Sequence, residues 1–147
     1  MIMNPTAIKH VVVDGHSLTL ESFVAIARYN ATVELAPSAL EAMKKSRALA
    51  EKIAAEGRVA YGITTGFGEF QKVAVPKEMS NQLSTNLILS HCTAAGEPYA
   101  DEIVRGMMLL RANALCGGVS GVRPILVEVL LEMLNKGVTP VVPDKAD

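Results

Sequence analysis

The chain has 147 residues, enough for one domain that buries roughly 70% of its unfolded-state surface. Its net charge of −1 provides no broad basic field, which argues against binding to nucleic acid or to an anionic membrane. Hydrophobic residues make up 50% of the sequence and aromatic residues only 4%, a mixture that favours closely packed helices.

The first part of the chain predicts a small β element and one helix. A β-branched run at residues 10–14 is typical of a strand or of one arm of a hairpin. Residues 18–29 have apolar side chains at helical spacing, with Thr19 as the expected N-cap and Asn30 as the expected stop. Residues 32–35 predict a second extended segment that can pair with the first.

A longer helix is predicted from Pro37 onward. Ser38 and Glu41 fit a capping box, in which each side chain accepts a hydrogen bond from a free backbone N–H of the first turn. Gly57 is the expected end of this helix, and a glycine-rich segment follows at residues 61–68.

Three further helices are predicted in the second half. The first covers residues 77–94, and the second covers residues 101–116 with an acidic residue in its first turn. For the third we expect Ser120 as the cap and Pro124 in the first turn. This helix is apolar on nearly every side between residues 122 and 134, which predicts burial. The whole pattern predicts one mainly α unit over residues 1–147, made of packed helices with a small N-terminal β element.

The two cysteines and the absence of a targeting segment indicate a cytoplasmic protein. Cys92 and Cys116 lie in apolar, helix-like surroundings, so buried free thiols in a reducing compartment are favoured over one disulfide. No N-terminal stretch has the order of a signal peptide, and no run of 18 apolar residues predicts a membrane span. Charged residues are only 20% where about 25% is usual, which indicates apolar surface covered by more chain or by partner subunits.

General functional motifs do not fit this sequence. Gly66-Phe67-Gly68 continues with Gln71 where a dinucleotide-binding fingerprint requires glycine. The segment from Gly118 to Val122 lacks the final glycine of a nucleophile elbow. The three histidines and two cysteines have no metal-ligand spacing, so no metal site is predicted.

Tyr61 stands at the edge of the glycine-rich segment, beside Gly62, Gly66, Phe67 and Gly68. Such a loop can carry a tyrosine into a pocket and close over what is bound there. A phenol has an ordinary pKa of about 10, so Tyr61 can act as a general base only where its anion is stabilised. The simpler alternative is a half-buried structural tyrosine.

Ser90 and His91 form the second candidate pair. His91 shares a helix face with Leu83 and Leu87, so a satisfied core histidine is one interpretation, with the Ser90 hydroxyl bonded back to a helix carbonyl. The other interpretation places both side chains on the substrate side of a helix that faces a pocket.

Several segments, in the right order and spacing, together resemble the N-terminal part of the aromatic amino acid lyase family. They are residues 61–68, 86–91, 110–113, 118–124 and 138–143, and the match extends from about His10 to Lys145. The Ser-His pair at the substrate-selectivity position resembles the histidine-specific branch of the family, where tyrosine- and phenylalanine-specific branches tend to show His-Leu or Phe-Leu.

The resemblance implies a mainly helical homotetramer with the ammonia-lyase (fumarase/aspartase-like) fold, which eliminates ammonia from L-histidine to give urocanate. It implies an electrophile that is no added cofactor, a methylidene-imidazolone (MIO) formed autocatalytically from an internal Ala-Ser-Gly. By the same resemblance, Tyr61 is the base that removes the substrate β-proton. Ser90 and His91 are the substrate-binding pair, in which His91 hydrogen-bonds the substrate imidazole.

The sequence departs from the family in one respect, because it contains no Ala-Ser-Gly and stops about where the family would enter it. We therefore expect a truncated N-terminal portion that is inactive alone. Two alternatives stay open: another aromatic amino acid ammonia-lyase or aminomutase, and a non-catalytic helical module for oligomerisation or subunit binding.

Overall fold

The computed structural model describes residues 3–60, 63, 80–92 and 94–145. The chain divides into two compact units. Met1–Arg47 and Pro98–Val142 make up the first unit, and Ala48–Glu97 and Pro143–Asp147 make up the second.

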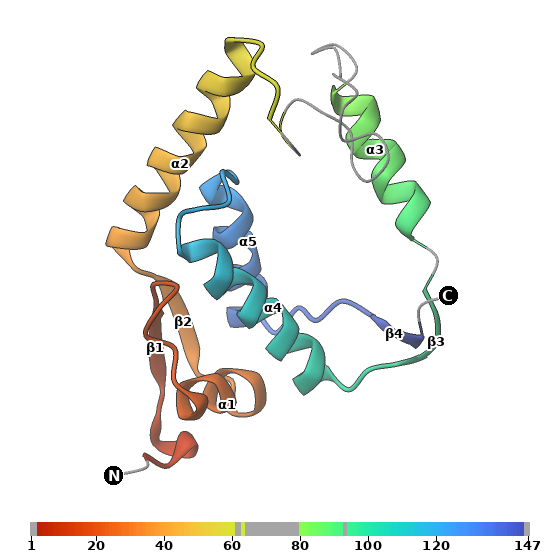
Figure 1. Cartoon of the computed structure of the whole chain (residues 1–147). Coiled ribbons are helices and arrows are strands. Elements are labelled where there is room, and N and C mark those ends of the chain that lie inside the picture. Colours follow the sequence, from red (N-terminus) through yellow and green to blue (C-terminus); the bar gives the residue numbers. More distant parts are fainter. Residues whose placement is uncertain (1–2, 61–62, 64–79, 93, 146–147) are drawn as a thin grey trace. The chain divides into compact units, whose positions relative to one another are not determined.

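The small β element of the first unit is a parallel pair of strands. Strand β1 (His10–Val13) pairs with β2 (Thr32–Leu35) in a register that places Val11 opposite Val33. Helix α1 (Leu20–Tyr29) makes the crossover between them, as parallel strands require (Figure 1). The predicted pairing is confirmed, and the hairpin alternative is wrong because the strands run in the same direction.

Both predicted ends of α1 are confirmed. The Thr19 hydroxyl accepts a hydrogen bond from the backbone N–H of Ser22 at 3.2 Å, which satisfies one free donor of the first turn. Asn30 has a φ of 55°, and this left-handed conformation ends the helix. A short 3₁₀ helix, η1 (Pro5–Ala7), precedes the first strand.

Helix α2 (Pro37–Ala55) begins two residues earlier than a capping box with Ser38 as its N-cap requires. Pro37 is already the first helical residue, where its missing N–H costs little. Ser38 therefore lies inside the first turn, and Glu41 forms an ion pair with Lys44 at 2.8 Å instead. The capping-box prediction is wrong, whereas Gly57 follows the helix with a φ of 65°, as expected.

Helices α4 (Asp101–Cys116) and α5 (Pro124–Asn135) complete the first unit (Figure 1). Helix α4 packs on both α1 and α5, and α5 packs on β2. The largest fully buried side chains belong to one core that these elements share with β1 and α2: Val13, Ile26, Met43, Val104, Leu109, Cys116 and Val127. Burial of each large aliphatic side chain contributes roughly 1.5–3 kcal/mol to the free energy of folding.

Helix α5 differs from its prediction in two ways. Its N-cap is Arg123 and not Ser120, and no side chain caps it, although Pro124 occupies the first turn as expected. Only one face is buried, through Val127, Leu131 and Leu134. Apolar side chains on the opposite face stay exposed within the described chain, so burial on every side is not observed.

The second unit contains α3 (Ser80–His91) and a two-stranded sheet of β3 (Ala95–Pro98) and β4 (Pro143–Lys145). Helix α3 confirms the central part of the predicted helix at residues 77–94. The sheet was not predicted, because Ala-Gly-Glu-Pro has neither β-branched residues nor an alternating pattern.

Candidate active site

The two candidate substrate-binding residues lie in the last turn of α3. Ser90 and His91 are both exposed, and Leu87 one turn earlier is half-buried. The prediction of a buried core histidine is therefore wrong for the described chain. An exposed imidazole at a helix end can meet a ligand, which leaves the substrate-side interpretation of the pair open.

Three polar atoms meet in this turn. The His91 Nδ1 atom lies 2.9 Å from the Leu87 carbonyl oxygen and 3.0 Å from the Ser90 hydroxyl oxygen. The Ser90 hydroxyl also donates to the Leu87 carbonyl at 3.0 Å, which is the back-bonding predicted for it. The ring is thus held by its Nδ1 side, and Nε2 makes no hydrogen bond within the described part of the chain.

Tyr61 and the loop residues Gly62, Gly66, Phe67 and Gly68 lie outside the described residues. That a lid carrying Tyr61 closes toward His91 therefore stays a prediction.

No metal site appears in the described part of the chain, where no three His, Cys, Asp or Glu side chains cluster. His10 lies on the surface, with Nδ1 at 3.0 Å from the Thr32 hydroxyl and Nε2 at 3.3 Å from a Glu34 carboxylate oxygen. His16 is exposed. None of the described helices is both long enough and apolar enough to cross a membrane.

The two cysteines are both free, as predicted, but their surroundings differ. Cys116 is buried at the end of α4, and desolvation raises the pKa of its thiol to about 11, so it is an unreactive core side chain. Cys92 is exposed, so the prediction that both thiols are buried is wrong for Cys92.

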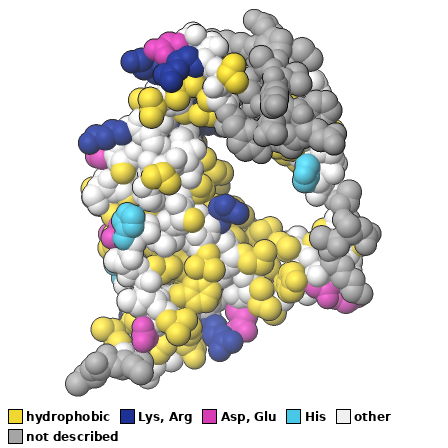
Figure 2. Space-filling view, in the orientation of Figure 1, with side chains coloured by type: hydrophobic (Ala, Val, Ile, Leu, Met, Phe, Trp, Pro, Cys, Tyr) yellow, Lys and Arg dark blue, Asp and Glu magenta, His cyan; other side chains and the backbone are white. Residues whose placement is uncertain are grey.

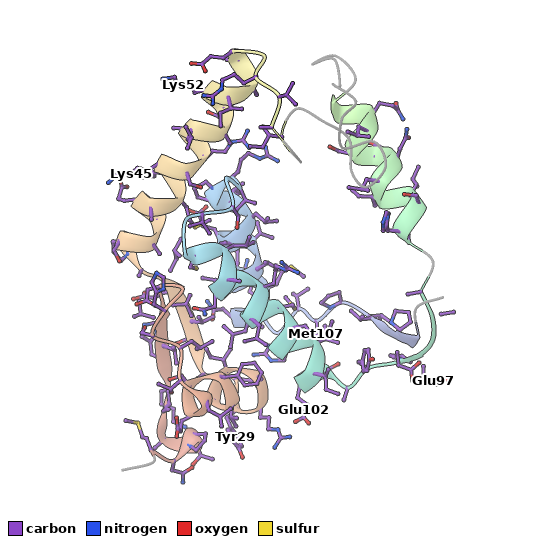
Figure 3. All side chains as sticks on the ribbon, in the orientation of Figure 1. Tyr29, Lys45, Lys52, Glu97, Glu102 and Met107 are labelled. Atoms are coloured by element: carbon purple, nitrogen blue, oxygen red, sulfur yellow. The ribbon has the colours of Figure 1, made fainter. Side chains whose placement is uncertain are left out.

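An open apolar groove lies between α1 and α4 in the first unit, with a volume of about 440 Å³. Gly106 lines the groove and lets the two helices approach closely, because a Cβ atom there would lie 2.7 Å from the Phe23 ring. Figure 2 shows hydrophobic side chains gathered over this part of α4, and Figure 3 shows Met107 on α4 with Glu102 at the helix start. Glu102 pairs with Arg28 of α1 at 2.7 Å, and both residues line the groove.

The segments at 110–113 and 118–124 that carried the resemblance have a clear scaffolding role. The Asn113 side chain accepts a hydrogen bond from the Gly15 N–H at 3.1 Å, across 98 residues of sequence. Gly118 has a φ of 69° and approaches α2 so closely that a Cβ atom would lie 2.6 Å from the Ala42 side chain. Gly121 then donates to the Ser46 hydroxyl at 2.9 Å. These residues hold the turns around α4.

Sequence reasoning missed two polar residues that fix the fold. Arg105 of α4 is buried with 5% exposure, and its guanidinium donates to the carbonyls of Ile26, Ala27 and Leu134. Asn135 exchanges two hydrogen bonds of 2.8 Å with the backbone of Val33. Nothing in the local sequence distinguishes either residue from a surface residue, because their partners lie far away in the chain.

Comparison with known proteins places this arrangement in a family. The sequence profile of the aromatic amino acid lyases matches residues 18–146. Histidine ammonia-lyase of Alkaliphilus metalliredigens is 47% identical over 137 residues, which is 93% of this chain and 27% of that protein. The chain thus spans about a quarter of the length of the curated relatives it matches.

Solved structures agree with the sequence match. Histidine ammonia-lyase from Trypanosoma cruzi superposes with a TM-score of 0.83 at 36% identity, over 94% of this chain and 26% of that one. Tyrosine aminomutase from Streptomyces globisporus superposes with a TM-score of 0.88 at 38% identity, over 93% of this chain and 26% of that one. The predicted mainly α fold of the ammonia-lyase type is confirmed, and this chain belongs to the aromatic amino acid lyase family.

Proposed function

We propose that this chain forms part of a histidine ammonia-lyase, which eliminates ammonia from L-histidine to give urocanate. The observation that carries the proposal is the 47% identity to a histidine ammonia-lyase over 93% of the chain. The Ser90-His91 pair at the exposed end of α3 supports the same substrate, because an imidazole can exchange a hydrogen bond with a matching side chain.

The roles of the chain's own residues follow from their chemistry. Tyr61 removes the β-proton of the substrate, and its phenolate needs stabilisation nearby because the ordinary pKa of a phenol is about 10. His91 binds the substrate imidazole and Ser90 supports it. Gly62, Gly66, Phe67 and Gly68 form the lid that closes over the bound amino acid.

The electrophile implied by the family, a methylidene-imidazolone, activates the amino group of the substrate to leave. This sequence has no Ala-Ser-Gly, so its 147 residues do not form that group. We propose that the complete site needs further polypeptide, and that the working assembly is a cytoplasmic homotetramer.

A chimera tests this function directly. The 147 residues replace the matching segment of the Alkaliphilus metalliredigens enzyme, and absorbance of the conjugated product is followed with L-histidine as the substrate. We expect the chimera to produce urocanate and the purified 147-residue chain to produce none. A folded chimera without turnover would exclude this function, and turnover by the chain alone would refute the need for further polypeptide.

A second candidate is an aminomutase or a lyase acting on another aromatic amino acid. The 38% identity to a tyrosine aminomutase supports this second candidate. A panel of L-histidine, L-tyrosine and L-phenylalanine on the chimera separates the two, with product identity read by mass and absorbance.

A third candidate is a non-catalytic helical module that oligomerises or binds a related subunit. The exposed apolar side chains of α4 and α5 favour it. If this candidate is right, the chimera folds but shows no turnover with any amino acid of the substrate panel.

A further inference from the structure

The last turn of α3 contains a closed triangle of polar atoms. His91 Nδ1 lies 2.9 Å from the Leu87 carbonyl oxygen, Ser90 Oγ lies 3.0 Å from that oxygen, and Ser90 Oγ lies 3.0 Å from His91 Nδ1. All three residues belong to one helix, so the arrangement depends only on local geometry.

The carbonyl oxygen decides which nitrogen of the neutral imidazole carries the proton. A carbonyl can only accept, so a ring nitrogen at 2.9 Å must donate to it. The opposite tautomer would bring the lone pair of Nδ1 against the lone pairs of the Leu87 oxygen. The Ser90 hydroxyl fits the Nδ1–H tautomer. It donates its hydrogen to the Leu87 carbonyl, and its oxygen accepts the second branch of a bifurcated hydrogen bond from Nδ1–H.

We propose that Ser90 and the Leu87 carbonyl hold neutral His91 in the Nδ1–H tautomer, so that Nε2 presents a lone pair to the substrate. This inference rests on the proposed function for its ligand, and it makes Ser90 a positioning residue. An Nε2 acceptor recognises a ring that carries an outward N–H or O–H donor, such as imidazole or phenol. A phenyl ring leaves this acceptor unpaired, which is the kind of mismatch that discriminates strongly.

The tautomer can be read without any catalysis. The 147-residue chain with ¹⁵N-labelled histidine is studied by long-range ¹H–¹⁵N NMR at alkaline pH, where imidazoles are neutral. We expect His91 to show a protonated Nδ1 and a bare Nε2, whereas exposed His16 shows the usual Nε2–H form. The Ser90→Ala variant should lower the ratio of Nδ1–H to Nε2–H about fivefold, the effect of one hydrogen bond.

Two control variants accompany this experiment. Ser90→Thr keeps the hydroxyl and should restore the ratio, and Ser84→Ala, earlier on α3, should leave it unchanged. An Nε2–H form of His91 in the unsubstituted chain would overturn the proposal. So would a Ser90→Ala variant with the same ratio, or backbone shifts showing that α3 is not helical.

The NMR result and the enzymatic result are independent. An inactive chimera in which His91 keeps the Nδ1–H form refutes the lyase function alone. An active chimera with an Nε2–H His91 refutes the positioning role of Ser90 alone.

Discussion

Arg105 shows how one residue can organise the first unit. Its guanidinium sits at the C-terminal ends of α1 and α5, where carbonyl groups lack helical partners and the helix dipoles favour a positive charge. Burial lowers the pKa of this guanidinium, which nevertheless stays charged at any physiological pH. The positive charge therefore joins two helix ends to α4.

Arg105→Met should destabilise the chain by about 2–4 kcal/mol, because the buried carbonyls of Ile26 and Ala27 lose this donor and the Leu134 carbonyl keeps only backbone partners. The measurement is urea unfolding of the purified chain. The matched control is Arg28→Met, which removes an exposed ion pair with Glu102 and should cost about 0–1 kcal/mol. Equal losses for the two variants would contradict the role given to Arg105.

Tyr61→Phe in the chimera should lower kcat about 10²- to 10⁴-fold, because the variant keeps the ring and loses the proposed base. The measurement is the initial rate of urocanate formation at saturating L-histidine. Tyr29→Phe, at the exposed end of α1, is the matched control and should leave kcat unchanged (Figure 3). Near-normal turnover by Tyr61→Phe would remove Tyr61 from the mechanism.

His91→Leu in the chimera should reduce kcat/KM for L-histidine about 10- to 100-fold, because the substrate imidazole loses its matched partner. The preference over L-phenylalanine should fall by a similar factor, which a competition assay measures. His16→Leu provides a control at an exposed histidine of the first unit. An unchanged preference would exclude His91 from substrate selection.

At the scale of elements, the turn after β1 is held against the end of α4. Asp14 accepts hydrogen bonds of 2.8 Å from the N–H groups of His16 and Ser17, and these bonds lower the pKa of its carboxyl group. Gly15 follows with a φ of 91°, and a Cβ atom there would lie 2.5 Å from the backbone nitrogen of Gly117. Only glycine fits both the conformation and the space.

Gly15→Ala should therefore destabilise the chain by about 3 kcal/mol, through backbone strain and overlap with Gly117 together. Gly57→Ala is the matched control, since Gly57 has a φ of 65° and no atom within 4 Å of the added Cβ. This variant should lose only about 1 kcal/mol of stability. Urea midpoints of the two variants give the comparison. A smaller loss at Gly15 than at Gly57 would contradict the close approach.

Asn135 completes the β element from the end of a helix. Its amide accepts from and donates to the Val33 backbone, as a neighbouring strand would. A two-stranded sheet in water is only marginally stable, so this side chain and the packing of α5 on β2 give the pair its support.

At the scale of the whole molecule, several apolar side chains stay exposed on helices that are otherwise well packed. Those of α4 are Ile103, Met107 and Leu110, and those of α5 are Ile125, Leu126 and Val129. These exposed apolar side chains on two packed helices are the kind of surface that a partner subunit or further polypeptide covers, which supports the proposed oligomer.

The purified chain should accordingly self-associate in a concentration-dependent way, which sedimentation velocity measures. Placing a charge in the middle of the exposed α5 face, as in Leu126→Lys, should shift the chain toward the monomer. Val119→Lys is the control, because Val119 is 87% exposed in a loop. A chain that stays monomeric at every concentration would contradict association through these helices.

Much of the fold could be predicted because its signals are local. Helical spacing, the Thr19 cap, the Asn30 stop and the glycine ends depend on residues within one or two turns of each other. The two wrong N-cap predictions, at Ser38 and Ser120, also have a local cause. In each case a nearby proline, Pro37 or Pro124, is the first residue of the helix, so the serine is not at the N-cap position.

For the candidate site, the sequence identified the residues but not their arrangement in space. Ser90 and His91 were identified from the sequence, but their exposure and their common bond to Leu87 come from the folded helix. The place of Tyr61 relative to them stays a prediction, because Tyr61 lies outside the described residues.

The sequence alone thus determined the helices, the pairing of two short strands and the family, because periodicity and motifs are written along the chain. The tertiary structure decided the parallel direction of the strands, the buried Arg105 and the contacts of Asn113 and Asn135. These contacts join residues 98 and 102 positions apart. Polar side chains of this kind meet their hydrogen-bond partners only when the helices pack, so no local sequence pattern predicts these contacts.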